Sequence, residues 1–409
     1  MYKFWHKFIL IAVSLCGAAG LAPSARAQEQ GLPPAKPFKH AMIFSGLALD
    51  FTAYIGLYDA ALESGNEPDL IIATSGGAVA AGIIAAFPDK EERKKFIESE
   101  DFYHFMSDLE VKSKRPSSFV ARLPRFVPRT YGLAPLTPNL FRKPLSEAPI
   151  PSNQTEFDRP FPSGADRPKI IIIAAKLEYS KANALRIGKK LFTETWFTDQ
   201  QTGEYLSGME SPVGARFSRS AVQANAEVRT DFTVAEGLLA SISEPYLFVP
   251  ACLNGELYTG GAVDLWPVEL AHELAGDITL PKLPDLSRTI ELAFGSVFEY
   301  SNKKRMREVQ EMSVSKWVDM EDNREVLKDS SFWFKVEMLK QEQDGSRSYL
   351  IPRPRVVYTA PANYEAFVER IRTQYEYGYE RGLGGLVQDE EMRQGFLAKR
   401  LQKLRDRND

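Results

Sequence analysis

The sequence predicts an α/β fold in which helices cover both faces of a mostly parallel central sheet. Apolar strand-like runs alternate along the chain with segments of helical spacing, the pattern of such a fold. Residues 169–175 form an unbroken apolar run, as expected of a strand buried on both faces. The 409 residues, 44% of them hydrophobic and 26% charged, can form one large α/β domain or two small ones.

The alternation begins near residue 40. A short apolar strand is expected at 40–45, and a helix at 51–64, where apolar residues recur at helical spacing. A second strand at 69–73 leads into a helix of small residues at 77–87. Further along, the expected elements are the strand at 169–175, a helix at 235–242, and strands at 290–298 and 355–359.

The first 27 residues are typical of a secretory signal peptide. Lys3 and Lys7 precede an apolar run of 15 residues, Phe8 to Ala22, which is shorter than the roughly 20 needed to span a bilayer. Ala25-Arg26-Ala27 has the small-x-small form of a cleavage site. We therefore expect export to the periplasm or the medium, with residues 28–39 as a polar, proline-bearing linker.

Cleavage would leave an acidic chain with one cysteine. It removes three basic residues and no acidic one, so the net charge falls from −3 to −6, which gives no argument for nucleic-acid binding. Cys252 would then have no intrachain disulfide partner. No histidines stand at metal-ligand spacing, so no metal and no cofactor is expected.

The strongest chemical signal is a serine between a strand and a helix. Thr74-Ser75-Gly76-Gly77-Ala78 follows the strand at 69–73, in the layout of a nucleophile elbow. The usual spelling is Gly-x-Ser-x-Gly, and here Ala73 replaces the first glycine. Small neighbours are needed because the turn is tight. The alternative is a serine that only caps the helix; the strand–turn–helix context favours a nucleophile.

Three blocks together resemble the patatin-like phospholipases. They are the strand end Ser45-Gly46-Leu47-Ala48, the Ser75 elbow, and the segment 238–268, in which Thr259-Gly260-Gly261 is followed by an apolar stretch and Pro267. The resemblance covers roughly residues 38–300 and implies a patatin-like three-layer α/β/α sandwich. It implies a serine acyl hydrolase of lipid esters, in which Ser75 is the nucleophile and backbone amides of Gly46, Leu47 and Ala48 form the oxyanion hole.

The chain departs from the family at the second catalytic position. The family has an aspartate where this chain has Thr259, and a threonine hydroxyl cannot accept a proton near neutral pH. Only the first glycine of the family's glycine-rich stretch remains, at Gly46. Loss of general-base help costs about 10²–10⁴ in rate, so we expect weak or absent activity. The alternative is an inactive patatin-fold protein that binds a lipid or a partner protein.

Two other residues are candidates to replace the missing catalytic aspartate. Asp264, five positions after Thr259, is an acid in the same loop, although it is also suited to capping that loop or the next helix. His272 would complete an order Ser75…Asp264…His272 like that of the unrelated α/β-hydrolases. His272 lies in an apparent helix, however, and the match over 238–268 argues against that fold.

The expected organisation is a patatin-like domain at 40–300, with a cap or insert at 112–165, and a C-terminal helical region at 301–409 that includes a returning strand near 355–359. Within the insert, residues 112–129 combine six basic residues with four sizeable apolar ones. We expect this segment to contact a lipid or membrane surface, because basic groups are attracted to anionic bilayers. The alternative is a solvated loop, and the charged stretch 390–407 is interpreted as a solvated helix.

Overall fold

The computed structural model describes most of the chain between residues 35 and 388. Outside the described residues lie 1–34, 48, 109–156, 165–166, 179–189, 246–247, 249, 287–290, 292–293, 296, 331–333, 340–352, 359–360, 385 and 389–409. The expected signal peptide, most of the linker and of the insert, and the charged stretch 390–407 therefore fall outside the description.

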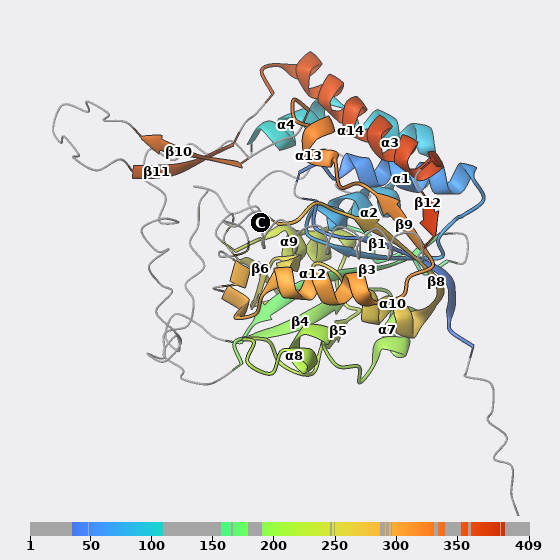
Figure 1. Ribbon diagram of the computed structural model, residues 1–409, viewed down its shortest axis with the longest axis vertical. Helices are drawn as coiled ribbons and strands as arrows, with labels where there is room; N and C mark the ends of the chain where they lie inside the picture. Colours follow the sequence, from blue (N-terminus) through green and yellow to red (C-terminus); the bar gives the residue numbers. More distant parts are fainter. Residues whose placement is uncertain are drawn as a thin grey trace, which may run out of the picture. The chain divides into compact units, whose positions relative to one another are not determined.

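A sheet of ten strands, counted over the described residues, forms the centre of the fold (Figure 1). Its order is β12-β9-β8-β1-β2-β3-β4-β5, and a hairpin of β6 and β7 pairs with β3. The strands are β1 (Phe38–Phe44), β2 (Leu70–Thr74), β3 (Lys169–Leu177), β4 (Phe192–Phe197), β5 (Glu227–Arg229), β6 (Ala251–Leu253), β7 (Glu256–Thr259), β8 (Ala275–Lys282), β9 (Lys316–Asp319) and β12 (Leu386–Gln388).

The five inner strands β9, β8, β1, β2 and β3 run parallel. The antiparallel pairs are β3 with β4, β3 with β7, β6 with β7, and β9 with β12. A mostly parallel sheet confirms the predicted fold class. It also places the carboxyl ends of β1 and β2 at one edge, where ligand sites of parallel sheets form.

Helices cover both faces of the sheet. On each face, an apolar cluster lies between the sheet and its covering helices. Alternate residues of a strand face opposite sides, so Met42 and Phe44 join one cluster while Ala41 and Ile43 join the other. The first cluster is covered by α1 (Thr52–Glu63), α2 (Gly76–Ala86), α3 (Lys90–Ile97), α4 (Glu100–Asp108), α9 (Val234–Ile242) and α14 (Tyr364–Gly384). The second is covered by α7 (Gln200–Leu206), α8 (Pro212–Arg216), α10 (Val268–Leu274) and α12 (Asn302–Glu311).

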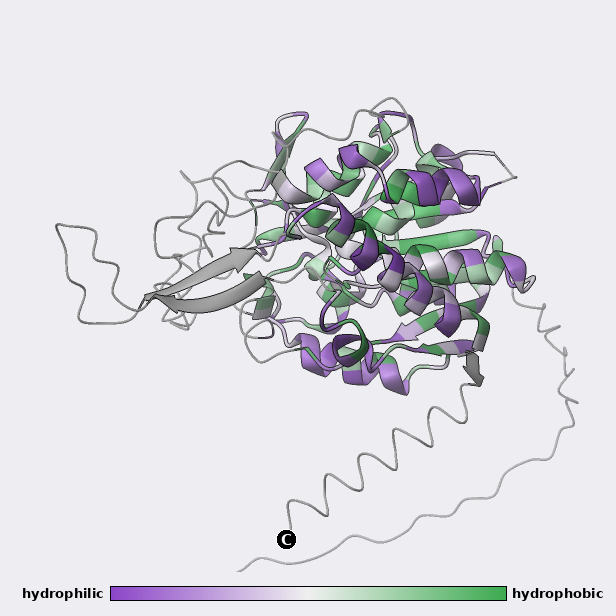
Figure 2. Cartoon of the chain, turned by 90° about the horizontal axis from the view of Figure 1, so that it is seen from above, coloured by the Kyte–Doolittle hydropathy of each residue, from purple (hydrophilic) through white to green (hydrophobic). Residues whose placement is uncertain are grey.

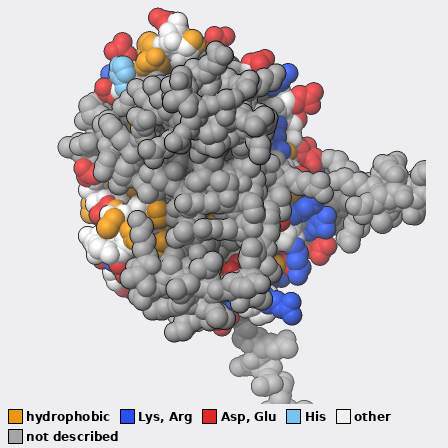
Figure 3. Space-filling view, turned by 90° about the vertical axis from the view of Figure 1, so that its left-hand side faces the viewer, with side chains coloured by type: hydrophobic (Ala, Val, Ile, Leu, Met, Phe, Trp, Pro, Cys, Tyr) orange, Lys and Arg blue, Asp and Glu red, His pale blue; other side chains and the backbone are white. Residues whose placement is uncertain are grey.

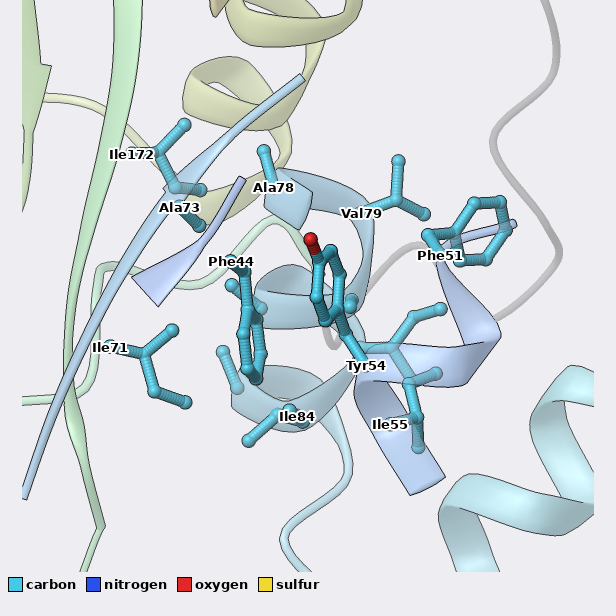
Figure 4. Packing of buried hydrophobic residues seen from close by; sticks show 14 of the residues in the cluster. Phe44, Phe51, Tyr54, Ile55, Ile71, Ala73, Ala78, Val79, Ile84 and Ile172 are labelled. Atoms are coloured by element: carbon cyan, nitrogen blue, oxygen red, sulfur yellow. The ribbon is translucent and has the colours of Figure 1, made fainter. Parts of the chain in front are cut away.

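Hydropathy follows this layering. Figure 2 shows apolar residues concentrated in the interior strands and on the inner sides of helices, with hydrophilic residues outside. Figure 4 shows the first cluster at close range, where the Phe44 ring of β1 stacks on Tyr54 of α1 with centroids 4.8 Å apart. Burial raises the pKa of Tyr54 far above its ordinary value, so its hydroxyl stays neutral in this apolar layer.

The C-terminal helix α14 packs directly on α1. A Cβ added to Gly378 would lie 1.7 Å from the carbonyl oxygen of Ala53, and one added to Gly56 would lie 2.0 Å from that of Tyr375. Only glycine at these two positions allows the backbones to approach so closely. Thr52 also donates a hydrogen bond to Gln374 across the contact, so α14 is part of the core.

The structure confirms the strands at 40–45, 69–73 and 169–175 and the helices at 51–64, 77–87 and 235–242, within a residue or two at each end. The strand expected at 290–298 is wrong, because the described residues there are helical. A short apolar run does not distinguish a buried strand from a buried helix.

The C-terminal third differs from expectation in two ways. The strand near 355–359 is present as β11 (Arg353–Tyr358), but it pairs with β10 (Phe334–Leu339) in a separate two-stranded sheet rather than returning to the central one. The central sheet also includes β9 and β12, which lie beyond the boundary expected at residue 300.

Candidate active site

Ser75 lies on a tight turn between β2 and α2, at the carboxyl edge of the parallel sheet. Its backbone has φ 55° and ψ −125°, a conformation that non-glycine residues rarely adopt and that costs about 1–3 kcal/mol. Such strain is typical of a serine on a nucleophile elbow. A Cβ on Gly77 would lie 2.1 Å from the Phe44 carbonyl oxygen, so the first turn of α2 requires glycine there.

A second serine fixes the elbow. The Ser75 amide donates a hydrogen bond of 2.9 Å to Oγ of Ser241, near the end of α9, and the Ser241 hydroxyl donates one of 2.6 Å to the Ile173 carbonyl of β3. Ser241 is fully buried. The strained turn is thus held between α9 and the centre of the sheet.

The turn after β7 lies against the elbow. The Thr74 hydroxyl donates a hydrogen bond of 2.6 Å to the Gly261 carbonyl. A Cβ on Gly261 would lie 2.5 Å from the Ser75 amide nitrogen, so only glycine fits. Thr259 itself is buried and donates its hydroxyl to the Ser243 carbonyl at 2.9 Å. That hydroxyl is committed to the backbone and supplies no base.

Of the residues expected to form the oxyanion hole, Gly46 lies beside the serine. A Cβ on Gly46 would be 3.6 Å from Cβ of Ser75 and 2.7 Å from Cδ2 of Leu265, so this backbone must come close to both. Leu47 is buried, and its carbonyl accepts the Asp50 amide at 3.1 Å. Ala48 lies outside the described residues.

A carboxylate that the sequence analysis did not single out lies in the same site. Glu244 follows α9 and is 5% exposed, and its Oε1 accepts the Ala262 amide at 3.2 Å. A Cβ on Gly260 would lie 2.1 Å from its Oε2, so the carboxylate rests against that glycine. Oε2 is buried without a hydrogen-bond partner of ordinary geometry among the described residues.

Burial raises the pKa of Glu244 to about 8, although the Ser75 side chain and the Ala262 amide both favour its ionised form. Ser75 lies close by, since its amide nitrogen would be 2.5 Å from a Cβ on Gly261, the residue next to Gly260. A signal for Glu244 was present in the sequence, since it is an acidic residue beside a proline in the apolar segment 238–249. Its proximity to Ser75 arises only in the folded chain.

Asp264 is fully buried and forms an ion pair with an arginine. Arg305 of α12 donates to its two carboxylate oxygens, at 3.3 Å from Nε and 3.1 Å from Nη2, and the Trp266 amide donates to Oδ1 at 3.1 Å. The same guanidinium pairs with Glu269. Burial raises the pKa of Asp264, while Arg305 opposes this. This arrangement fixes the loop before α10, and both carboxylate oxygens of Asp264 are engaged in it.

His272 does not complete a triad. It lies in the last turn of α10 and is half-buried, and burial, followed by the nearby Lys36 charge, lowers its pKa, while the Ser313 backbone opposes the shift. Asp264 is held by Arg305 instead. The order Ser75…Asp264…His272 therefore does not correspond to a chain of contacts.

The described part of the chain contains no group of three or more His, Cys, Asp or Glu residues able to hold a metal ion. None of its helices has both the length and the apolar character needed to cross a bilayer.

In the face shown in Figure 3, basic and acidic side chains are interspersed along the described surface.

Comparisons with known proteins extend this picture. A family model described as "Patatin-like phospholipase" matches residues 42–272, a range that includes Ser75, Glu244 and Thr259. No curated protein sequence matches the chain. Among solved structures, VipD from Legionella pneumophila is similar at a TM-score of 0.32 and 12% identity, covering 88% of this chain and 67% of that one.

Proposed function

This chain belongs to the patatin-like phospholipase family, and we propose that it is a serine acyl hydrolase of lipid esters with Ser75 as its nucleophile. Family membership supports a lipid-hydrolase type of function. In the proposed reaction, Ser75 Oγ attacks the acyl carbonyl carbon to give an acyl-enzyme, which water then hydrolyses. Backbone amides near Gly46 would stabilise the developing oxyanion.

The observation that supports this proposal best is the backbone of Ser75. A serine that only caps a helix has an ordinary extended backbone, whereas Ser75 has φ 55° and is held there by Ser241 and Gly261. Such strain persists only where the surroundings impose it, and it clusters at functional sites. Gly46, at the end of the neighbouring strand, lies beside Ser75 as an oxyanion donor must.

A second candidate function is an inactive patatin-fold protein that binds a lipid or a partner protein. The observation that favours it is Thr259, whose hydroxyl is used by the Ser243 carbonyl. Fold and family are the same in both cases, so only chemistry separates them.

The deciding experiment is covalent labelling with a fluorophosphonate, combined with hydrolysis of phospholipid and short-chain ester substrates. We expect labelling of the wild type and its loss in Ser75→Ala. Ser218→Ala is the matched control, because Ser218 is exposed and remote from the elbow in sequence. Absence of both labelling and hydrolysis in folded wild-type protein would favour the inactive alternative.

Location and partner are also proposals from the sequence. The signal peptide at 1–27 supports export to the periplasm or the medium, and the basic and apolar segment 112–129 supports contact with a lipid surface. Both lie outside the described residues.

A further inference from the structure

Resting on the proposed function, we infer that Glu244 is the general base for Ser75, so that a Ser75–Glu244 pair replaces the family's serine–aspartate dyad. The structure places the Glu244 carboxylate against Gly260 and the Ser75 amide against Gly261, its immediate neighbour in the chain.

The position of the lost aspartate cannot supply the base. Thr259 donates its hydroxyl to a backbone carbonyl, and a threonine hydroxyl does not take up a proton near neutral pH. Asp264, the nearest acid in the same loop, has both oxygens engaged by Arg305 and Trp266.

Glu244 differs from Asp264 because one of its oxygens is free. Oε1 is held by the Ala262 amide, which fixes the carboxylate plane, while Oε2 is buried without a partner among the described residues. A buried carboxylate oxygen without a partner is costly and requires an explanation. Proton exchange with the Ser75 hydroxyl provides one, because Ser75 lies against Gly261, the neighbour of the glycine that Oε2 contacts.

The environment also suits a base that works near neutral pH. The influences on the Glu244 pKa are burial, the Ser75 side chain and the Ala262 amide; none of them is a charge. Burial raises the pKa to about 8, so the carboxylate binds a proton more strongly than a solvated glutamate does and releases it readily near neutrality. Catalytic hydrogen bonds are often loose before substrate binds.

The steps balance as follows. Glu244 takes the hydroxyl proton as Ser75 Oγ bonds to the acyl carbon, and it returns that proton to the alcohol oxygen as the ester C–O bond breaks. Water then attacks the acyl-enzyme and gives one proton to Glu244. That proton passes to Ser75 Oγ as the fatty acid leaves. The sum is ester plus water giving acid plus alcohol.

The test is Glu244→Gln in the full chain. The amide keeps the size of the side chain and can still accept the Ala262 amide, but it cannot take up a proton. We expect kcat/KM for ester hydrolysis to fall by about 10²–10⁴. Wild-type kcat/KM should rise with pH through a midpoint near 8, the pKa of Glu244, and Glu244→Gln should lose that rise. Glu194→Gln is the matched control, because Glu194 is a second buried glutamate whose pKa is raised to about 8, and it faces the other apolar cluster through Trp196.

Circular dichroism and melting curves establish that each variant is folded. A folded Glu244→Gln protein that keeps wild-type kcat/KM or the same pH profile would overturn the dyad. If Ser75→Ala still abolished labelling in that case, the proposed function would stand. An inert wild type would overturn both. A Glu244→Gln variant that does not fold is replaced by Glu244→Asp, which keeps the carboxylate and should retain the pH rise at a reduced rate; loss of that rise would contradict the proposal.

Discussion

Arg305 holds Asp264 through two buried hydrogen bonds, at 3.3 and 3.1 Å, with both side chains fully shielded from solvent. We predict that Asp264→Asn lowers the free energy of unfolding by about 1.5–3 kcal/mol, because the buried Arg305 guanidinium loses a charged hydrogen-bond partner and keeps only Glu269 as counter-charge. Denaturant titration measures this. The folded fraction should keep the wild-type pH profile of hydrolysis, and a changed profile would place Asp264 in the chemistry.

Thr259→Asp tests whether a carboxylate at the family's position can replace Glu244. In the Glu244→Gln background we expect the added aspartate to raise ester hydrolysis at least about tenfold, as part of the 10²–10⁴ that a general base contributes. Thr259→Asn in the same background has the same shape and no base, and it should give no gain. In the wild-type background a second carboxylate would compete with Glu244 for one proton, so no increase is expected. Equal rates for the aspartate and asparagine variants would show that this position does not reach Ser75.

Gly378→Ala tests the contact between α14 and α1. The new methyl would lie 1.7 Å from the Ala53 carbonyl oxygen, so the helices must separate, and we expect a loss of about 1–3 kcal/mol or more in the free energy of unfolding. Gly384→Ala, in the same helix with open space at its Cβ, should be neutral or slightly stabilising. Equal melting temperatures for the two variants would refute the close contact.

Glu194 provides a test of stability against pH. It is buried beneath Trp196 and Ser211, and burial raises its pKa to about 8, above the ordinary value near 4.5 that it regains on unfolding. The folded state therefore binds the proton more tightly, so this stabilisation is present at low pH and is lost as pH rises towards 8. Each pKa unit corresponds to about 1.4 kcal/mol.

The measurement is the free energy of unfolding between pH 5 and 8.5. We expect it to fall with pH in the wild type and to fall less in Glu194→Gln, while the Glu244 contribution remains. Glu204→Gln, at an exposed position of α7, should leave the slope unchanged. An unchanged slope in Glu194→Gln would contradict the raised pKa.

Membrane contact is tested by liposome co-sedimentation. Changing Arg122, Arg125 and Arg129 to Gln should weaken binding to anionic vesicles on the order of a hundredfold, since basic residues near such a surface contribute about 1 kcal/mol each. Added salt should weaken wild-type binding too. Changing Arg393, Lys399 and Arg400 to Gln removes the same charge from the C-terminal stretch and should have little effect. Equal losses for the two triple variants would indicate a non-specific charge effect.

The sequence predicted the parts of the fold that depend on local pattern. The apolar run at 169–175 became the central strand β3, and the small residues after Ser75 became α2. The strand expected at 290–298 was wrong because periodicity alone cannot distinguish the two kinds of buried element. The roles of β9 and β12 depend on pairing between distant segments, which no local pattern records.

The site was predicted in the same uneven way. Ser75 and Gly46 were identified because the elbow and the strand end are contiguous in sequence. Glu244 was not predicted because the family resemblance points to the aspartate position and the loop after it. Glu244 reaches the serine through the turn Gly260–Gly261, and that proximity arises only when α9 and β7 pack on β3.

The packing of α14 on α1 has a consequence for folding during synthesis. The family match ends at residue 272, yet the partner of Gly56 is at residue 375 and the partner of Ala53 is at 378. When synthesis has reached residue 300, every candidate catalytic residue has therefore been made, but α14, the helix that covers α1, has not. Asp59, which is fully buried and accepts a hydrogen bond of 2.8 Å from Tyr375, still lacks that donor. Because an uncovered apolar helix face promotes association, the incomplete chain is more prone to aggregate than the finished one.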